Sequence, residues 1–163
     1  MNSTVLLEQA RLGLPHDLQQ RYFRDFPERG VHLAVMNEPY LSLLMKGRKT
    51  VESRFSRSRT EPFERAQVDD LVLLKAGRVV GAFVVSSTDY RDLRPNELAD
   101  VRADLNDQIL ASDDFWEAKA SAAYATLLGV GDVFDFPPFT VSKRDMRGWV
   151  VLRPAAKMST LAW

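Results

Sequence analysis

Residues 71–87 constrain the fold more strongly than any other part of the chain. Their sequence, LVLLKAGRVVGAFVVSS, consists of two apolar runs rich in β-branched residues, which are separated by Ala76 and Gly77. Such runs with a short glycine-containing connection predict two strands joined by a tight turn. Asp69 and Asp70, just before the first run, are typical of another turn. We therefore expect a β-hairpin here.

Other segments of the chain have recognisable strand or helix patterns. The expected strands cover residues 31–36, 49–55, 133–143 and 148–154. The expected helices cover residues 2–13, 15–26, 39–47, 95–110 and 113–129. The last of these helices carries Trp116 and Tyr124 eight residues apart, a spacing typical of the core. Pro137 and Pro138 restrict their segment to an edge strand or a loop.

These elements favour one fold class. Five or six short strands, mostly connected locally, indicate an α+β fold with a small antiparallel or mixed sheet or barrel rather than a doubly wound sheet. The chain has 163 residues, 45% of them apolar, which suits a single domain with a core. Residues 1–30 are expected to form an N-terminal helical extension, and residues 31–163 the main domain.

The composition excludes several classes of site. The chain has no cysteine, which removes disulfides, thiolate chemistry and cysteine-ligated metals. The two histidines, His16 and His32, do not have a metal-ligand spacing, so we expect neither a metal nor a cofactor. No apolar run is long enough to cross a membrane, and no signal peptide is recognisable. These features predict a cytoplasmic protein without a membrane partner.

The charges are unevenly distributed although the net charge is zero. Residues 46–59 contain six cations and one carboxylate, and residues 143–157 contain five cations and one carboxylate. Residues 89–117, in contrast, contain nine carboxylates and three arginines. This pattern indicates either a molecule with one positive face or separate solvated surface segments.

The stretch GRKTVESR, residues 47–54, concentrates cations around one carboxylate. Gly47 stands where a helix is expected to end, and the alternation after it predicts a strand. Glu52 and Arg54 share the polar face of that strand, and Lys49 precedes them. Arginine offers a planar fork to a phosphate or a base edge, and lysine a point charge. Two interpretations stay open: a structural salt-bridge cluster, or the floor of a binding cleft.

The same eight residues fit the pattern G-x-K-x-x-E-x-R, which resembles the signature of the ASCH domain family of the PUA-like superfamily. The neighbouring elements are also similar: an apolar strand and a proline-started helix precede the pattern, and an acidic turn and a hairpin follow it. The segments FWEAK (115–119) and SKRDMRGWVVL (142–152) resemble the bacterial branch. The resemblance covers residues 31–153 and implies a small β-barrel with a cleft. Asp69 stands where the family usually has glycine.

The resemblance also implies a ligand class. ASCH proteins bind RNA or modified nucleotides and nucleosides, here through Lys49, Glu52 and Arg54. Some members hydrolyse acetylated cytidines and others are reported as ribonucleases, so Lys49 and Glu52 are the catalytic candidates if this chain is an enzyme. The hydrolytic members use a Lys–Thr–Glu arrangement, in which the threonine stands two residues before the motif arginine. In this chain Glu52 occupies that position. Residues 79–87 contain no carboxylate, which also disfavours amide hydrolysis.

Five further residues are candidates for the binding surface. Arg57, Lys143 and Arg144 can extend a basic surface along a phosphate backbone, or they are solvated loop residues. Lys75 is either a pocket residue or an edge lysine whose stem lies along apolar surface. Trp149 alternates with valines and is either a core or cleft-wall residue or a surface on which a base stacks.

Three functions are therefore retained as hypotheses. The favoured one is a module that binds RNA or a modified nucleotide, without a cofactor. The second is an enzyme, either a nucleoside amidohydrolase or a ribonuclease. The third is a protein-interaction domain in which residues 1–30 or the acidic helix 95–110 dock a partner.

Overall fold

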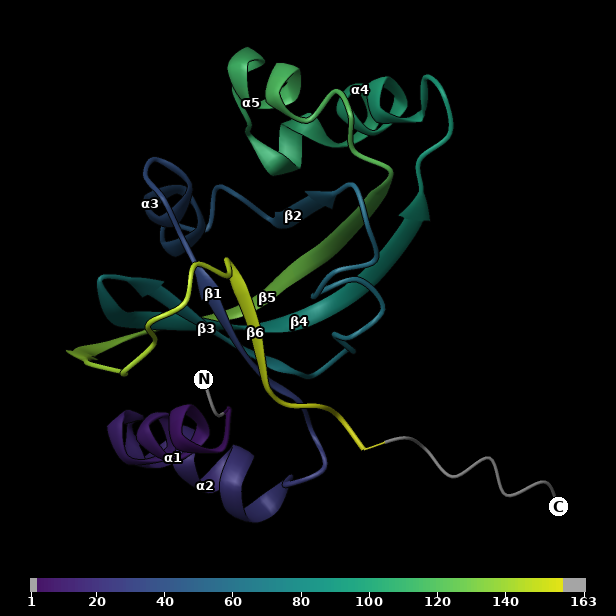
Figure 1. The fold of residues 1–163 in the computed structure, drawn as a ribbon. Coiled ribbons are helices and arrows are strands. Elements are labelled where there is room, and N and C mark those ends of the chain that lie inside the picture. Colours follow the sequence, from purple (N-terminus) through teal and green to yellow (C-terminus); the bar gives the residue numbers. More distant parts are fainter. Residues whose placement is uncertain (1–2, 157–163) are drawn as a thin grey trace, which may run out of the picture.

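The computed structural model describes residues 3–156, in which six strands form one curled sheet in the order β2-β5-β4-β3-β1-β6. The strands are β1 (Val31–Val35), β2 (Val51–Ser56), β3 (Leu71–Ala76), β4 (Arg78–Asp92), β5 (Tyr124–Phe139) and β6 (Trp149–Arg153). β1 and β3 are parallel, and all other neighbouring strands are antiparallel. Figure 1 shows the long strands β4 and β5 bending across the molecule. The predicted α+β class is confirmed, with a mixed sheet that forms a half-barrel.

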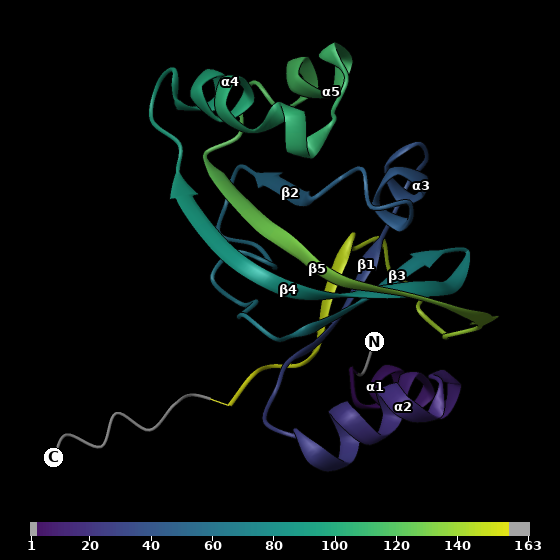
Figure 2. The ribbon, with the colours of Figure 1, turned by 180° about the vertical axis from the view of Figure 1, so that it is seen from behind.

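The helices lie on two sides of this sheet. They are α1 (Ser3–Gly13), α2 (His16–Gln20) with the π-helical turn η1 (Arg21–Asp25), α3 (Tyr40–Met45), α4 (Glu97–Ile109) and α5 (Asp113–Ala118). Figures 1 and 2 show α1 and α2 on one side of the sheet, and α4 and α5 on the other side, next to β2. The second pair therefore lies on the side that carries the GRKTVESR strand.

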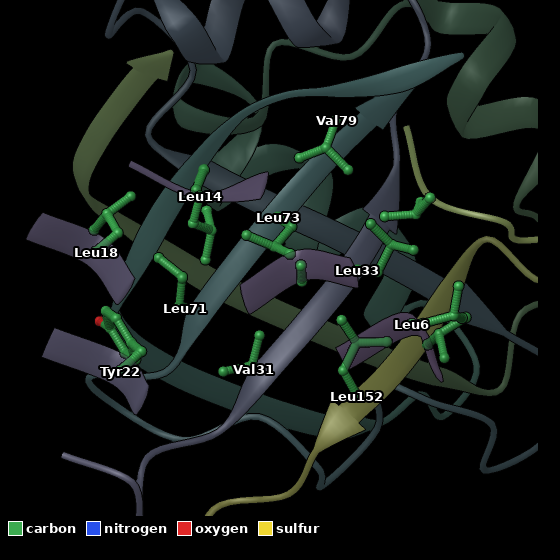
Figure 3. Packing of buried hydrophobic residues seen from close by; sticks show 14 of the residues in the cluster. Leu6, Leu14, Leu18, Tyr22, Val31, Leu33, Leu71, Leu73, Val79 and Leu152 are labelled. Carbon is green, nitrogen blue, oxygen red and sulfur yellow. The ribbon is translucent and has the colours of Figure 1, made fainter. Parts of the chain in front are cut away.

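The N-terminal helices are part of the core. Figure 3 shows side chains of α1, α2 and η1 packed against β1, β3 and β6. The labelled buried residues are Leu6, Leu14, Leu18, Tyr22, Val31, Leu33, Leu71, Leu73, Val79 and Leu152. Each such side chain contributes about 1.5–3 kcal/mol when it leaves water. The apolar face of residues 3–25 is thus buried against the sheet. Only the outer face, on which Val5 and Leu12 are exposed, is available to the protein partner of the third hypothesis.

The helix predicted for residues 113–129 is wrong in its second half. α5 ends at Ala118, and Tyr124 begins β5, so Trp116 and Tyr124 do not share a helix. Leu127 and Leu128 lie in a central strand that pairs with β2 on one side and β4 on the other. A strand buried between two neighbours has a nearly continuous apolar sequence, and periodicity alone cannot distinguish such a run from a buried helix.

Two turns that lead into the site need a left-handed backbone. Gly47 has φ of +75° and ends α3, where the N–H groups of Arg48 and Lys49 both donate to the carbonyl of Leu43. Asp69 has φ of +76° in the turn before β3. Aspartate tolerates this conformation better than most residues, which explains how it stands where glycine was expected. Both predicted turns are confirmed.

Candidate functional site

A pocket of about 400 Å³ lies between β2, the start of α3 and the α4–α5 pair. Its wall consists of Val35, Met36, Asn37, Tyr40, Lys49, Glu52, Ser53, Arg54, Phe55, Ile109, Ala111, Phe115, Ala118 and Lys119. The three charged residues predicted from the GRKTVESR stretch therefore line one pocket. They do not form a solvated strand face, because Lys49 is 2% exposed and Glu52 is 5% exposed.

Lys49 connects the strand side of the pocket to its helical cover. Its Nζ donates a hydrogen bond of 2.8 Å to the carbonyl of Ile109, the last residue of α4. It also lies 5.6 Å from the ring centre of Tyr40. No other acceptor within residues 3–156 hydrogen-bonds this ammonium group, which has three N–H donors. Burial lowers the pKa of Lys49, against the effect of the Glu52 charge, and the charge of Arg54 lowers it further.

Glu52 carries the least satisfied polar atom of the site. Its Oε1 accepts a hydrogen bond of 3.2 Å from Nε of Arg54. Its Oε2 is buried and has no hydrogen-bond partner among the described residues. A buried acceptor without a donor costs about 1–3 kcal/mol, and more when it is charged. An N–H group of a ligand that reaches this oxygen would remove this cost.

Arg54 joins parts of the sheet that lie far apart in its strand order. Its Nη2 donates to the carbonyl of Val35 at 3.0 Å, and its Nη1 to that of Gly148 at 3.3 Å. β2 is one edge of the sheet, whereas β1 and β6 form the other end. The guanidinium therefore connects the two ends of the half-barrel, and it lies 5.3 Å from the ring centre of Trp149. With its donors directed at Glu52 and at backbone carbonyls, Arg54 positions Glu52 rather than offering a free fork to a phosphate.

Two of the other predicted cations lie away from the pocket wall. Arg57 is exposed and donates to the Ser121 hydroxyl at 3.0 Å. Lys75 is half-buried at the end of β3 and is not part of the wall. Neither residue forms an ion pair with Glu52 among the described residues.

The second predicted basic segment is partly neutralised within its own loop. Lys143 donates to the backbone carbonyl of Asp145 at 2.6 Å, and its Nζ lies 3.1 Å from the carboxylate. Arg144 is exposed. Trp149 is 3% exposed, which agrees with a core or cleft-wall position and leaves no ring face for stacking. Lys157, the last cation of this segment, lies outside the described residues.

Sequence reasoning missed the helical side of the pocket. Tyr40 and Phe115 provide aromatic surface, and their ring centres are 5.8 Å apart. Asn37 and Lys119 provide polar groups of the same wall. Phe115 belongs to the FWEAK segment, but helical spacing drew attention to Trp116 and Tyr124 instead.

A buried network of His32, Asp70 and Trp149 lies next to the site. The indole N–H of Trp149 donates to Nδ1 of His32 at 3.1 Å, so Nε2 carries the ring proton and donates to Asp70 at 2.8 Å. Asp70 also accepts from the backbone N–H of Gly30 at 2.7 Å and of Gln67 at 3.0 Å. A Cβ at Gly30 would lie 2.3 Å from the Asp70 carboxylate, so this close approach requires glycine. The network ties β1, β6 and the turn before β3 together.

The described residues contain neither a metal site nor a membrane span. No group of histidine, aspartate and glutamate side chains within residues 3–156 could hold a metal ion. None of the helices in that range is long and apolar enough to cross a membrane.

The arrangement of strands and helices matches solved ASCH structures. The crystal structure of ASCH from Zymomonas mobilis superposes with a TM-score of 0.60 at 12% sequence identity, covering 76% of this chain and 87% of that chain. The chain has the fold of an ASCH domain. A serine-to-alanine and a tyrosine-to-phenylalanine mutant of the Zymomonas protein both give TM-scores of 0.61, at 14% and 13% identity. They cover 77% of this chain and 90% and 91% of theirs. No protein-family model and no curated protein sequence matches the chain.

The ASCH fold agrees with the resemblance of residues 47–54 to the family pattern. At this low identity the agreement concerns the fold, and membership of the bacterial branch stays a prediction. Within the ASCH fold, Lys49, Glu52 and Arg54 occupy the wall of the pocket described above.

The free energy of unfolding of the wild type, relative to that of a Lys49→Met variant, is expected to rise as the pH increases above neutrality. Burial lowers the pKa of Lys49 from its usual value of 10.5, so the unfolded chain binds more protons than the folded chain between the two pKa values. The free energy of unfolding should therefore rise through the folded pKa and level off above the unfolded one. The lost hydrogen bond to Ile109 adds a constant difference.

Urea titrations of both proteins from about pH 7 to pH 11 measure this difference. A Lys46→Met variant, which removes an exposed lysine, is the control and should show no such rise. A difference between wild type and Lys49→Met that is independent of pH would contradict the desolvation of the Lys49 ammonium group.

Proposed function

We propose that the pocket beside β2 binds the base of a nucleotide in RNA or of a modified nucleoside. The observation that carries this proposal is the buried Glu52 Oε2, which has no donor among the described residues, together with the Lys49 ammonium group in the same wall. A buried acceptor next to a donor with unused N–H groups suits a ligand edge that carries an N–H and a carbonyl or ring nitrogen side by side. The Watson–Crick edges of nucleobases have this arrangement.

The rest of the pocket suits a flat heterocycle. Tyr40 and Phe115 supply aromatic surface, on which bases pack well. A volume of about 400 Å³ lies within the range of small-molecule sites. The resemblance of residues 47–54 to the ASCH pattern implies the same ligand class and supports the proposal independently of the pocket.

Glu52→Gln is expected to weaken binding of a cognate nucleoside by about 10- to 100-fold, because a hydrogen bond to a charged acceptor contributes about 1.5–3 kcal/mol. Glutamine keeps the size of the side chain and an oxygen for Arg54, but loses the carboxylate charge. Calorimetric titration with the four ribonucleosides, acetylcytidine and a short RNA measures the affinity. Glu117→Gln removes an exposed carboxylate that is not part of the pocket and serves as the matched control.

Lys49→Met should weaken binding of the same ligand, and Lys46→Met should leave it unchanged. Equal affinity for wild type, Glu52→Gln and Lys49→Met would rule out this pocket as the site. Thermal unfolding of each variant separates a loss of binding from a loss of folded protein.

One observation favours catalysis as a second candidate function. The pKa of Lys49 is lowered by burial, which makes a neutral amine, and hence a general base, more accessible. Glu52 still stands where the hydrolytic members of the family have a threonine, so amide hydrolysis would need a different arrangement of groups. Chromatography of the same acetylcytidine and RNA mixtures after incubation decides the question. A product that the wild type forms and Lys49→Met does not would show that the protein is an enzyme. The absence of any such product would favour a binding module.

A further inference from the structure

The pocket adjoins a second recess on the other side of Arg54 and Trp149. A small hollow of about 120 Å³ shares Arg54 and Phe55 with the pocket wall. The same hollow shares Thr60, Glu61, Gly148 and Trp149 with a larger recess of about 500 Å³. The three depressions therefore follow one another along the surface. We call the part formed by Arg59, Thr60, Glu61, Arg147, Gly148 and Trp149 the arginine recess.

Two arginines give the arginine recess its chemistry. The Arg59 side chain is 61% exposed, and its guanidinium lies 4.0 Å from the carboxylate of Asp92 and 5.8 and 5.5 Å from the ring centres of Phe63 and Tyr124. The Arg147 side chain is 49% exposed and pairs with Asp145 at 2.8 Å. The loose, exposed Arg59–Asp92 pair contributes little and is easily exchanged for another anion, whereas Arg147 donates to Asp145 through both Nε at 3.1 Å and Nη2 at 2.8 Å. Arg59 can therefore turn its planar fork towards a phosphate, and Arg147 can add its Nη1, which has no hydrogen-bond partner within residues 3–156.

One acidic residue of the recess is already engaged elsewhere. Glu61 lies 3.5 Å from Arg65 through Oε1 and accepts a hydrogen bond of 3.4 Å from the backbone N–H of Val151 through Oε2. The two arginines then outnumber the carboxylates of the recess wall. The side chain of Thr60 is exposed in the same wall and adds a hydroxyl donor for a phosphate oxygen.

We propose that the arginine recess binds the phosphate of the nucleotide next to the one whose base enters the pocket. This rests on the proposed function, and it narrows the ligand to a single-stranded oligonucleotide rather than a free nucleoside. The base pocket and the recess then act in sequence along one strand, with Arg54 and Trp149 between them. The base pocket supplies recognition, and the recess supplies affinity that depends on salt.

The test compares a nucleoside with a trinucleotide of the same base at several salt concentrations. The trinucleotide should bind more tightly at low salt, with a slope of log K against log salt of about −0.7 for each phosphate contacted. An Arg59→Gln/Arg147→Gln double variant should lower trinucleotide affinity by about 10-fold at low salt and make the slope shallower by about 0.7, the contribution of one phosphate. Its affinity for the nucleoside should equal that of the wild type.

Arg78→Gln/Arg94→Gln removes the same charge from two exposed arginines outside the recess and is the control. It should leave the salt slope unchanged. The inference is overturned if the recess variant keeps the wild-type slope, or if the control lowers the slope equally. In both cases the proposed function still stands if Glu52→Gln weakens nucleoside binding, whereas an unchanged nucleoside affinity of Glu52→Gln would overturn the proposed function itself.

Discussion

Replacing Asp70 by alanine is expected to lower the free energy of unfolding by about 4 kcal/mol. Asp70 is 1% exposed and accepts hydrogen bonds from the backbone N–H groups of Gly30 and Gln67 and from the ring of His32. Alanine would leave these three donors without a partner in the interior. Each buried donor without an acceptor costs about 1–3 kcal/mol.

The matched control is Asp69→Asn. Asp69 is the preceding carboxylate, its side chain is 58% exposed, and asparagine tolerates the left-handed backbone at this position. Urea unfolding should place the control within about 0.5 kcal/mol of the wild type. A loss below about 1 kcal/mol for Asp70→Ala would mean that water replaces the carboxylate, and that the network does not hold β1 to the turn before β3.

Replacing Arg54 by methionine is expected to cost about 3 kcal/mol and to abolish measurable nucleoside binding. The variant loses the hydrogen bonds to Val35 and Gly148 that connect β2 with the other end of the sheet. It also leaves the buried charge of Glu52 without its only hydrogen-bond donor among the described residues. Removing one partner of a buried pair costs more than the pair contributes, because the remaining charge stays desolvated.

A second substitution separates these two causes. The Glu52→Met/Arg54→Met double variant should be more stable than Arg54→Met alone, because it removes the isolated charge. Arg91→Met is the control. Arg91 forms the same i, i+2 ion pair with Asp89 on β4 at 2.7 Å, but these side chains are 35% and 45% exposed. Its cost should stay below about 1 kcal/mol. A double variant less stable than Arg54→Met would show that the unpaired carboxylate of Glu52 does not destabilise the Arg54→Met protein.

Local features of the sequence predicted much of the fold. The hairpin of β3 and β4, the helix α4 and the turn at Gly47 follow from short patterns of apolar residues and turn formers. The error in residues 113–129 has the opposite origin. There the strand β5 exists because β2 and β4 flank it, and its own sequence is compatible with either structure.

Three members of the candidate site were predicted from the sequence, but their roles and the helical side of the pocket were not. Lys49, Glu52 and Arg54 were identified from a pattern of eight residues, and the structure brings all three to one pocket. Their environment depends on partners far along the chain. Lys49 donates to a carbonyl 60 residues away, and Arg54 to one 94 residues away. No local pattern contains such contacts.

The network of His32 shows the same limit. His32 forms hydrogen bonds with Asp70, 38 residues later, and with Trp149, 117 residues later. The spacing of the two histidines had predicted only that they do not bind a metal. The pairing became visible only when the parallel strands β1 and β3 and the antiparallel strand β6 came together.

By itself, the sequence determined most of the strands and helices, but not the strand that begins at Tyr124, and it determined which eight residues carry the concentrated charge. The tertiary structure alone decided that Lys49 and Glu52 are buried, that Arg54 holds the ends of the half-barrel together, and that one buried oxygen of Glu52 has no hydrogen-bond partner among the described residues. The physical reason is that propensity and turn chemistry act over a few residues, whereas burial and hydrogen-bond satisfaction depend on distant segments that pack against each other.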